Sequence, residues 1–309
     1  MSGLENGFFT RRRIFDGIGT NVEGALTSEE AIKKAGLDWE VVQRKLYTED
    51  GMRVNNVMAN VRDSDQRVMG IVSNKYSVLQ NSEAFAFTDS LVEEAGMKYV
   101  AAGCTNSGLV FLCAQLPEHY ILNGDEFSPY LLFLNSHAGD SKIRCAMIPH
   151  RIVCQNMINV SLASAKRIWG VKHVGDITSK LDDARETLFN SKKYMAELGK
   201  SLYELEKIKL SDSKVNSFIE ELYPATADMS DIQYKNAKKQ QDELKRRFFD
   251  APDLQDVGQN GYKMINAVAN MVGNSKPLRE TPYYRENVFR KSVESNTLLD
   301  KTYAMLQAA

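Results

Sequence analysis

The chain has 309 residues, of which 43% are hydrophobic and 26% charged, and its formal net charge at pH 7 is −1. A disordered chain and a uniformly basic, histone-like nucleic-acid binder are therefore excluded. No apolar run approaches the roughly 20 residues that span a bilayer, and residues 1–10 lack a basic start followed by an apolar stretch, so we expect no membrane partner and no secretory signal.

The first predicted helix starts at a capping box, in which Thr27 and Glu30 satisfy free backbone N–H groups at the helix start. This helix is short and ends near Gly36. Apolar and β-branched residues, separated by turn residues, then predict four successive strands at 39–47, 54–61, 67–73 and 76–80.

A second helix follows Asn81-Ser82, because apolar residues recur at three- and four-residue steps from Ala84 to Ala95 before Gly96 ends the pattern. Two β-hairpins come next, pairing residues 99–104 with 109–116 and residues 130–134 with 142–148. The connections are too short for crossovers, so neighbouring strands are expected to be antiparallel. A further helix is predicted from about Cys154 to Ala165.

From Leu181 to Leu205, apolar residues alternate three- and four-residue steps in a heptad-like pattern. A coiled-coil seam between chains and a bundle helix that packs on its own chain both give this pattern, and the bundle helix is the preferred interpretation. The seam is also one of two grounds on which we expect a homo-oligomer. Four more helices, separated by prolines, are predicted at 213–222, 231–249, 261–272 and 283–307.

Together these elements predict an α+β fold, with an antiparallel β-meander and helices at the front and an all-helical C-terminal part. No strand pattern returns after His173, so the boundary is placed near residue 175. The predicted domains are residues 1–175, which contain a basic hairpin, and residues 176–309, which contain the heptad-like helix.

Charge is unevenly distributed between residues 130 and 175, where six basic residues accompany one acid, Asp140. A basic strip in a chain of nearly zero net charge favours an anionic ligand, although a sheet whose solvent face happens to be basic gives the same pattern. If the second hairpin packs on the helix that follows it, these cations converge on one face. The predicted nucleic-acid contacts are Lys142, Arg144, Arg151, Lys166, Arg167, Lys172 and His173.

Signatures of known catalytic and cofactor sites are missing from the sequence. It has no GxxxxGK[ST], GxSxG or HExxH motif, and Gly17, Gly19 and Gly24 lack the spacing of a dinucleotide-binding loop. Four cysteines without a Cys-x-x-Cys pair predict reduced thiols in a cytoplasm. The side chains of His137, His150, Cys145 and Cys154 do not have the spacing of a standard zinc site, so we expect no metal. Because no known motif occurs, we also expect no cofactor and no catalytic residue.

Several longer motifs resemble those of a known family. Residues 71–81, Ile-Val-Ser-Asn-Lys-Tyr-Ser-Val-Leu-Gln-Asn, followed by Glu83-Ala84-Phe85, are similar to the signature of the phage/plasmid-like family called domain of unknown function 932. The resemblance extends to Pro129–Leu132, Asn135-Ser136-His137, Val153–Asn156, Lys172-His173, residues 24–39 and residues 266–277. It implies residence on prophages, plasmids and other mobile elements in a bacterial host cell, and it supplies no established activity.

The resemblance also singles out a set of polar residues, namely Asn81, Asn135, Ser136, His137, Gln155 and Asn156. Two positions depart from the family pattern. Ala138 stands where the family commonly has an aspartate, with Asp140 displaced past Gly139, and Ile148-Pro149-His150 stands where many relatives carry Thr-Pro. An aspartate with an acid–base or metal-binding role could not act from the same place here, which argues against an enzyme.

The leading functional hypothesis is a nucleic-acid-associated protein, similar in fold logic to the phage single-strand-annealing proteins of recombination, which lay a DNA strand in a basic groove. Tyr130, Phe133 and Trp169 would then be base-stacking platforms, or else core residues. The alternative is a protein–protein effector that inhibits a host defence or restriction protein, with the helical half as its docking surface. A third hypothesis is an unrecognised hydrolase that uses His137, Asp140 and Cys154.

Overall fold

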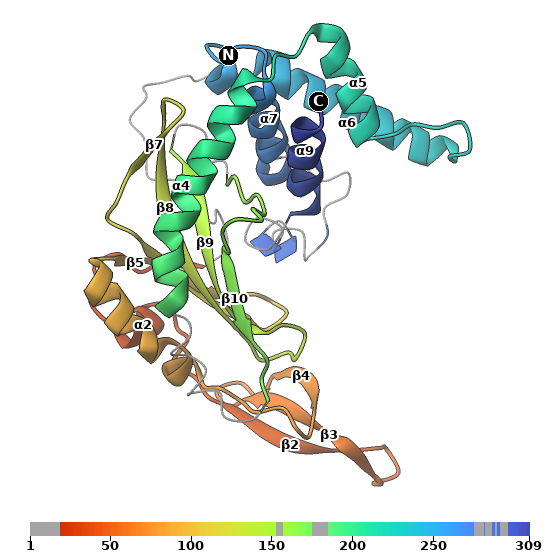
Figure 1. Ribbon diagram of the computed structural model, residues 1–309. Helices are drawn as coiled ribbons and strands as arrows, with labels where there is room; N and C mark the ends of the chain where they lie inside the picture. Colours follow the sequence, from red (N-terminus) through yellow and green to blue (C-terminus); the bar gives the residue numbers. More distant parts are fainter. Residues whose placement is uncertain are drawn as a thin grey trace, which may run out of the picture.

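The computed structural model describes residues 19–152, 157–174, 185–274, 281, 286–287, 289–290 and 296–309. Figure 1 shows a central sheet, a group of helices at one end of it and a smaller sheet that projects from the other end. The predicted α+β fold with a helical C-terminal part is confirmed. No helix in the described part of the chain is long and apolar enough to cross a membrane.

The central sheet has seven strands in the order β1-β5-β6-β8-β9-β10, with β7 paired to β8. Both predicted hairpins are confirmed, because β5 pairs with β6 and β8 pairs with β9, each in antiparallel orientation. The connection between β5 and β6 closes at Gly108, where a φ of 84° favours glycine. The strands are β1 (Thr20–Asn21), β5 (Lys98–Cys104), β6 (Leu109–Gln115), β7 (Tyr120–Leu122), β8 (Asp125–Ser136), β9 (Ile143–Arg151) and β10 (Ile168–Val171).

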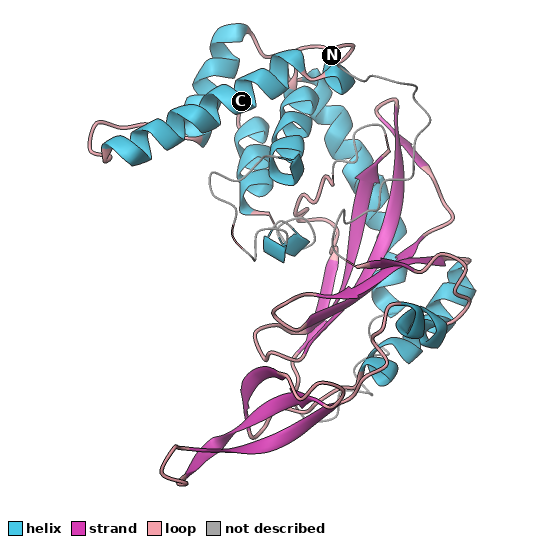
Figure 2. Cartoon of the chain, turned by 180° about the vertical axis from the view of Figure 1, so that it is seen from behind, coloured by secondary structure: helices cyan, strands magenta, loops and turns pink. Residues whose placement is uncertain are grey.

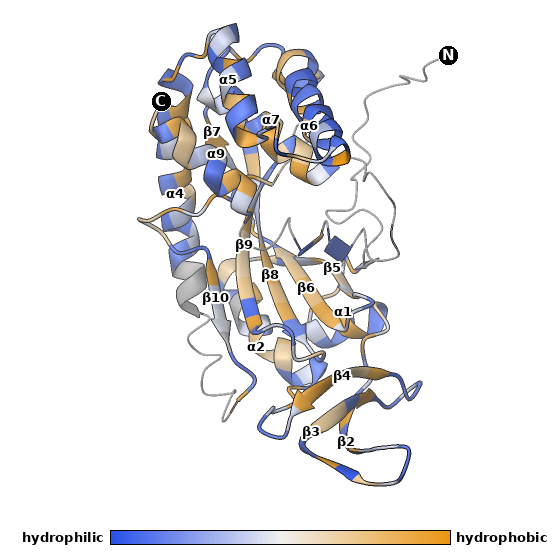
Figure 3. Ribbon diagram, turned by 90° about the vertical axis from the view of Figure 1, so that its right-hand side faces the viewer, coloured by the Kyte–Doolittle hydropathy of each residue, from blue (hydrophilic) through white to orange (hydrophobic). Residues whose placement is uncertain are grey.

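Helices α1 (Ser28–Lys34), α2 (Asn81–Ala95) and α4 (Arg185–Lys207) share a core with one face of this sheet. Figure 1 shows α4 running along the strands. Alternate strand residues divide between two cores: Leu131 and Phe133 pack with the helices, whereas Leu132 and Leu134 pack with Phe289 on the opposite face. Strands β6, β8 and β9 are accordingly apolar on both faces (Figure 3).

Helix α4 packs on its own chain. Met195, Leu198, Leu202 and Leu205 are at most 1% exposed and belong to the same core as the sheet, and α4 contacts β7, β9 and α7. The preferred interpretation of the heptad pattern, a bundle helix, is therefore confirmed for residues 190–207. The homo-oligomer stays a prediction, now without this seam as its basis.

Beyond α4 the chain is helical, and α7 is buried along most of its length against α4, α6 and α9. One continuous core includes residues on both sides of the predicted boundary at 175, from Val22 to Leu306. Among the described residues beyond 210, no strand joins the central sheet. The elements are α5 (Asp212–Leu222), α6 (Asp231–Asp250), the 3₁₀ helix η2 (Pro252–Leu254), α7 (Gly261–Asn274) and α9 (Thr297–Gln307).

A three-stranded sheet, which we call the arm, projects from the end of the central sheet opposite helices α5, α6, α7 and α9 (Figures 1 and 2). It consists of β2 (Val41–Tyr47), β3 (Arg53–Arg62) and β4 (Val68–Ser73) in that order. Close packing holds its base against the β8–β9 connection, because a Cβ at Gly70 would lie 2.5 Å from the carbonyl oxygen of Ala138. Only glycine permits this approach.

The segment before α2 and the segment after β9 differ from the predictions. Residues 76–80 form no strand, because their backbone bonds go elsewhere: Ser77 donates its N–H to the carbonyl of His173. Residues 157–165 form no helix, since Ile158 and Val160 enter the core from an irregular segment.

Two further elements were placed incompletely by the sequence. Strand β10 is not predicted. Within the single helix expected from 283 to 307, residues 286–287 and 289–290 are helical, and α9 begins separately at Thr297, where the Asn296 side chain accepts from the N–H of Leu298. Asn135 and Ser136 are the last residues of β8 and are buried, whereas the predicted hairpin ends this strand at residue 134 and leaves both in the connection.

Candidate functional site

Most of the predicted phosphate contacts lie on or beside the edge of the central sheet, where β10 pairs with β9. Arg144 is opposite Gly170 in this pair, which places Lys142 and Lys172 at the same end of the two strands. Lys142 and Lys172 are exposed and Arg144 is partly exposed. A Cβ at Gly170 would lie 3.3 Å from Cγ of Arg144 and 3.7 Å from Cδ of Lys142, so both basic side chains lie across this glycine.

Alternation along β10 decides which other side chains join them. Arg167 and Trp169 are buried, whereas Lys166 and Lys172 are exposed. The pairing continues before β10, because Met147 donates its N–H to the Arg167 carbonyl at 3.0 Å, so Lys166 lies on the outward face with the glycine. We call the four side chains on this face, Lys142, Arg144, Lys166 and Lys172, the basic ribbon.

Burial removes two predicted contacts from this surface. The Arg151 side chain is 2% exposed and forms ion pairs with Asp125 at 2.9 Å and with Asp253 at 3.0 Å. Arg167 donates to the carbonyl of Met147 at 2.9 Å, and burial lowers the pKa of its guanidinium. The prediction that Arg151 and Arg167 contact phosphates is therefore corrected, because both guanidinium groups are used inside the fold.

The three aromatic residues considered as base-stacking platforms lie in the core. Tyr130, Phe133 and Trp169 are at most 9% exposed. Phe133 packs edge-on against Phe87 of α2, with ring centres 5.7 Å apart, and Tyr130 packs edge-on against His150. Of the two interpretations left open by the sequence, core packing is the one that the structure supports.

The polar residues of the family motifs meet in a buried layer between α2, β8 and the arm. Asn81 donates through Nδ2 to the carbonyl of Leu37 at 2.8 Å, and its Oδ1 lies 2.9 Å from Nε2 of His137. Because this amide oxygen can only accept, Nε2 of His137 carries the proton. Asn135 donates to the carbonyl of Leu79 at 2.9 Å. We call Asn81, Asn135, Ser136 and His137 the polar junction.

The polar junction fixes the arm to the sheet. Asn60 of β3 donates to the carbonyl of His137 at 2.8 Å, and the Tyr76 hydroxyl donates to the carbonyl of Ser136 at 2.5 Å. His173 stacks on Tyr76 with ring centres 4.6 Å apart. Motif residues that are distant in the sequence thus form one buried polar connection, while Gln155 and Asn156 lie outside the described residues.

Burial keeps the histidines of this region neutral. It lowers the pKa of His137 to about 3, with a smaller contribution from the charge of His173, and it lowers the pKa of His173 to about 4. His173 therefore brings no positive charge to the basic ribbon at neutral pH, which corrects its predicted role. His137 has no exposed surface, so a substrate cannot reach its imidazole in this conformation.

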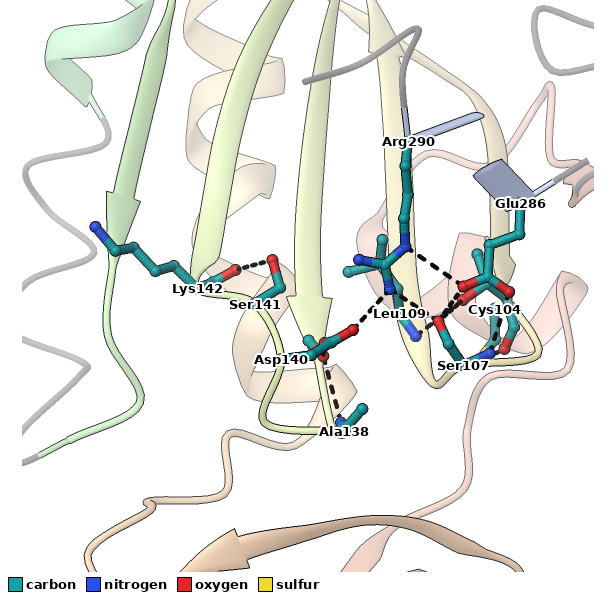
Figure 4. Close-up of polar contacts among 11 residues, drawn as sticks. Cys104, Ser107, Leu109, Ala138, Asp140, Ser141, Lys142, Glu286 and Arg290 are labelled. Atoms are coloured by element: carbon teal, nitrogen blue, oxygen red, sulfur yellow. Dashed lines mark hydrogen bonds and ion pairs between the residues drawn. The ribbon is translucent and has the colours of Figure 1, made fainter. Parts of the chain in front are cut away.

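Asp140 takes part in a different contact from the one that the hydrolase hypothesis requires. It accepts from Oγ of Ser136 at 2.6 Å and from the guanidinium of Arg290 at 3.0 Å. Figure 4 shows that Arg290 reaches the tips of both hairpins, through Ser107 and Asp140, and that Glu286 reaches Ser107 at the tip of the first. No local sequence signal predicts this contact, because Arg290 and Asp140 are 150 residues apart.

The described residues give little support to a cysteine nucleophile or to a metal site. Burial raises the pKa of the Cys113 and Cys145 thiols, and it raises that of Cys104 to about 11, so these thiols stay protonated at neutral pH. The described part of the chain contains no group of three or more His, Cys, Asp or Glu side chains that could hold a metal ion. Cys154, the proposed nucleophile, lies outside the described residues.

Comparison with protein families gives one match, to the family described as a domain of unknown function, DUF932, over residues 68–297. The chain belongs to this family. The resemblance predicted from the sequence motifs is thereby confirmed, and the matched region includes both the basic ribbon and the polar junction of this DUF932 protein. No curated protein and no solved structure is detectably similar to the chain.

Proposed function

We propose that this DUF932 protein binds nucleic acid through the basic ribbon. The observation that carries the proposal is the placement of Lys142, Arg144, Lys166 and Lys172 on one outward face of an edge strand pair. Lys166 and Lys172 flank strand β10 and are six residues apart, which corresponds to about 20 Å of extended chain at roughly 3.3 Å per residue. A track of this length is suited to several consecutive phosphates of a nucleic-acid backbone.

The salt dependence of the binding constant tests the proposal quantitatively. Each phosphate neutralised by a cation releases counterions, and the slope of log K against log salt is about −0.7 per contact for single strands and about −0.9 for duplexes. Four contacts predict slopes of about −3 and −4, respectively. A gel-shift series from 50 to 200 mM salt, with single- and double-stranded oligonucleotides, measures both slopes.

A triple variant, Lys142→Glu, Lys166→Glu and Lys172→Glu, tests the site itself. All three side chains are exposed, so the variant should fold normally by circular dichroism and lose binding. The matched control places the same change of net charge on α6, with Lys235→Glu, Lys239→Glu and Lys245→Glu, which are also exposed. Equal loss in both variants would contradict a localised site, and absence of binding by the parent protein would contradict the function.

A second candidate function is the predicted effector that inhibits a host defence or restriction protein; the observation that favours it lies on the arm and not on the helical half named from the sequence. Tyr47 and Met52 are 58% and 63% exposed at its tip, and Val68 and Ile71 are 57% and 62% exposed on β4. Exposed aromatic and methionine side chains are typical of protein contact surfaces. A Tyr47→Ser, Met52→Ser variant should keep nucleic-acid affinity and lose protection of incoming DNA in a restriction assay; retained protection would contradict this candidate.

A further inference from the structure

The face of the sheet edge that carries the basic ribbon presents no aromatic ring among the described residues. Trp169 lies between Ile168 and Gly170 in β10, and alternation turns its ring toward the core, where it is 9% exposed. The outward positions between Lys166 and Lys172 are Ile168 and Gly170, which have no π-system. Strand geometry therefore separates the cations of this edge from its nearest indole.

The side chains that do face outward are suited to binding the charged phosphates of a nucleic acid rather than its bases. Three of the four are lysines, whose ammonium groups are point charges on flexible stems with no planar group to stack on a base. The fourth, Arg144, is partly buried and its stem lies across Gly170. A phosphate can approach such a surface from many directions, whereas a base needs a ring or a fixed hydrogen-bonding group.

The exposed aromatic side chains of the described residues lie elsewhere. Tyr47 is at the tip of the arm, Tyr203 is on α4 and Tyr234 is on α6. Tyr203 and Tyr234 each have a lysine of their own helix above the ring, at 4.3 and 5.9 Å from the ring centre. Figure 1 places α6 and the arm tip at opposite ends of the molecule, away from β10.

We infer that the ligand of the basic ribbon is the sugar–phosphate backbone alone, so that single strands, duplexes and RNA are bound without contact to the bases. This inference rests on the proposed function and makes it narrower. It departs from the annealing-protein hypothesis, in which aromatic side chains would stack on the bases of a single strand. Affinity should follow the number and spacing of phosphates and should not depend on base identity.

An abasic oligonucleotide tests this directly. The dissociation constants of the full-length protein for a 20-nucleotide oligo-dT and for a 20-nucleotide abasic strand, both labelled at the 5′ end, are measured by fluorescence anisotropy at 50 mM salt. We expect the two values to agree within about twofold, because each stacked base would contribute about fivefold or more to affinity. The triple variant Lys142→Glu, Lys166→Glu, Lys172→Glu should lose both ligands.

The possible results separate the two claims. If the abasic strand binds fivefold or more weakly while the triple variant still loses oligo-dT, the ribbon site stands and the backbone-only inference is wrong. If the parent protein binds neither oligonucleotide, the proposed function fails and the inference fails with it. Equal binding of both strands, abolished by the triple variant and kept by the α6 control variant, supports both.

Discussion

His173 stacks on Tyr76, yet neither of its ring nitrogens has a partner in hydrogen-bonding geometry among the described residues. The polar connection at this position is made by the backbone, because the carbonyl of His173 accepts from the N–H of Ser77. A buried polar atom left unsatisfied costs about 1–3 kcal/mol. The imidazole therefore contributes its stacked face and carries a cost that a hydrocarbon ring would not.

We predict that His173→Phe keeps or raises the free energy of unfolding at pH 7 and weakens its dependence on pH. The folded-state pKa of His173, about 4, lies below its value of about 6.5 in the unfolded chain. The stability contributed by such a group is complete above pH 6.5 and is lost as the pH falls toward 4. The native protein should thus lose about 1–2 kcal/mol more than the variant between pH 7 and pH 5.

Urea unfolding at the two pH values measures this difference. The control is His119→Gln, at a surface position where the side chain is 47% exposed and pairs with Glu126; this variant should change the free energy of unfolding at pH 7 by less than about 0.5 kcal/mol. Equal losses for His173→Phe and the native protein would show that the imidazole is not buried in the neutral form.

At the scale of secondary-structure elements, local patterns predicted what depends on neighbours in the sequence. The heptad spacing located α4 and the residues that it buries, and the Thr27 and Gly96 signals marked the start of α1 and the end of α2. Strand β10 was missed because it has four residues and its regularity comes from pairing with β9. A segment this short gives no period to detect.

We predict that Leu202→Ala lowers the free energy of unfolding by about 2–5 kcal/mol, the usual cost of emptying a fully packed leucine site. Leu202 is 1% exposed in the core that α4 shares with the sheet. Because that packing is intramolecular, the loss should be the same at 1 and at 50 μM protein, roughly a range over which an associating coiled coil would gain stability. Lys200→Ala, at a largely exposed position on the same helix, is the control and should change stability by less than about 0.5 kcal/mol.

At the scale of the whole molecule, the order of elements was predictable and the long-range contacts were not. The sequence predicts a surface cation at Arg151, because its partners, Asp125 and Asp253, are 26 and 102 residues away. The polar motif residues were identified as a group, but their meeting at the base of the arm depends on the packing of β3, α2 and β8. The continuity of the core across residue 175 likewise follows from tertiary packing.

This continuous core leads us to predict that the regions before and after residue 175 unfold together. Both tryptophans, Trp39 and Trp169, lie in the first region, whereas most of the helix lies in the second, so fluorescence and circular dichroism at 222 nm report on different parts of the molecule. Their urea transitions should coincide.

The variant Arg151→Met leaves the carboxylates of Asp125 and Asp253 without their ion-pair partner at the contact with η2. It should lower the free energy of unfolding by about 3 kcal/mol and shift both midpoints together. Arg246→Met, which removes an exposed ion pair on α6, should leave both nearly unchanged. Two separate transitions in the native protein would instead establish residues 1–175 and 176–309 as independent folding units.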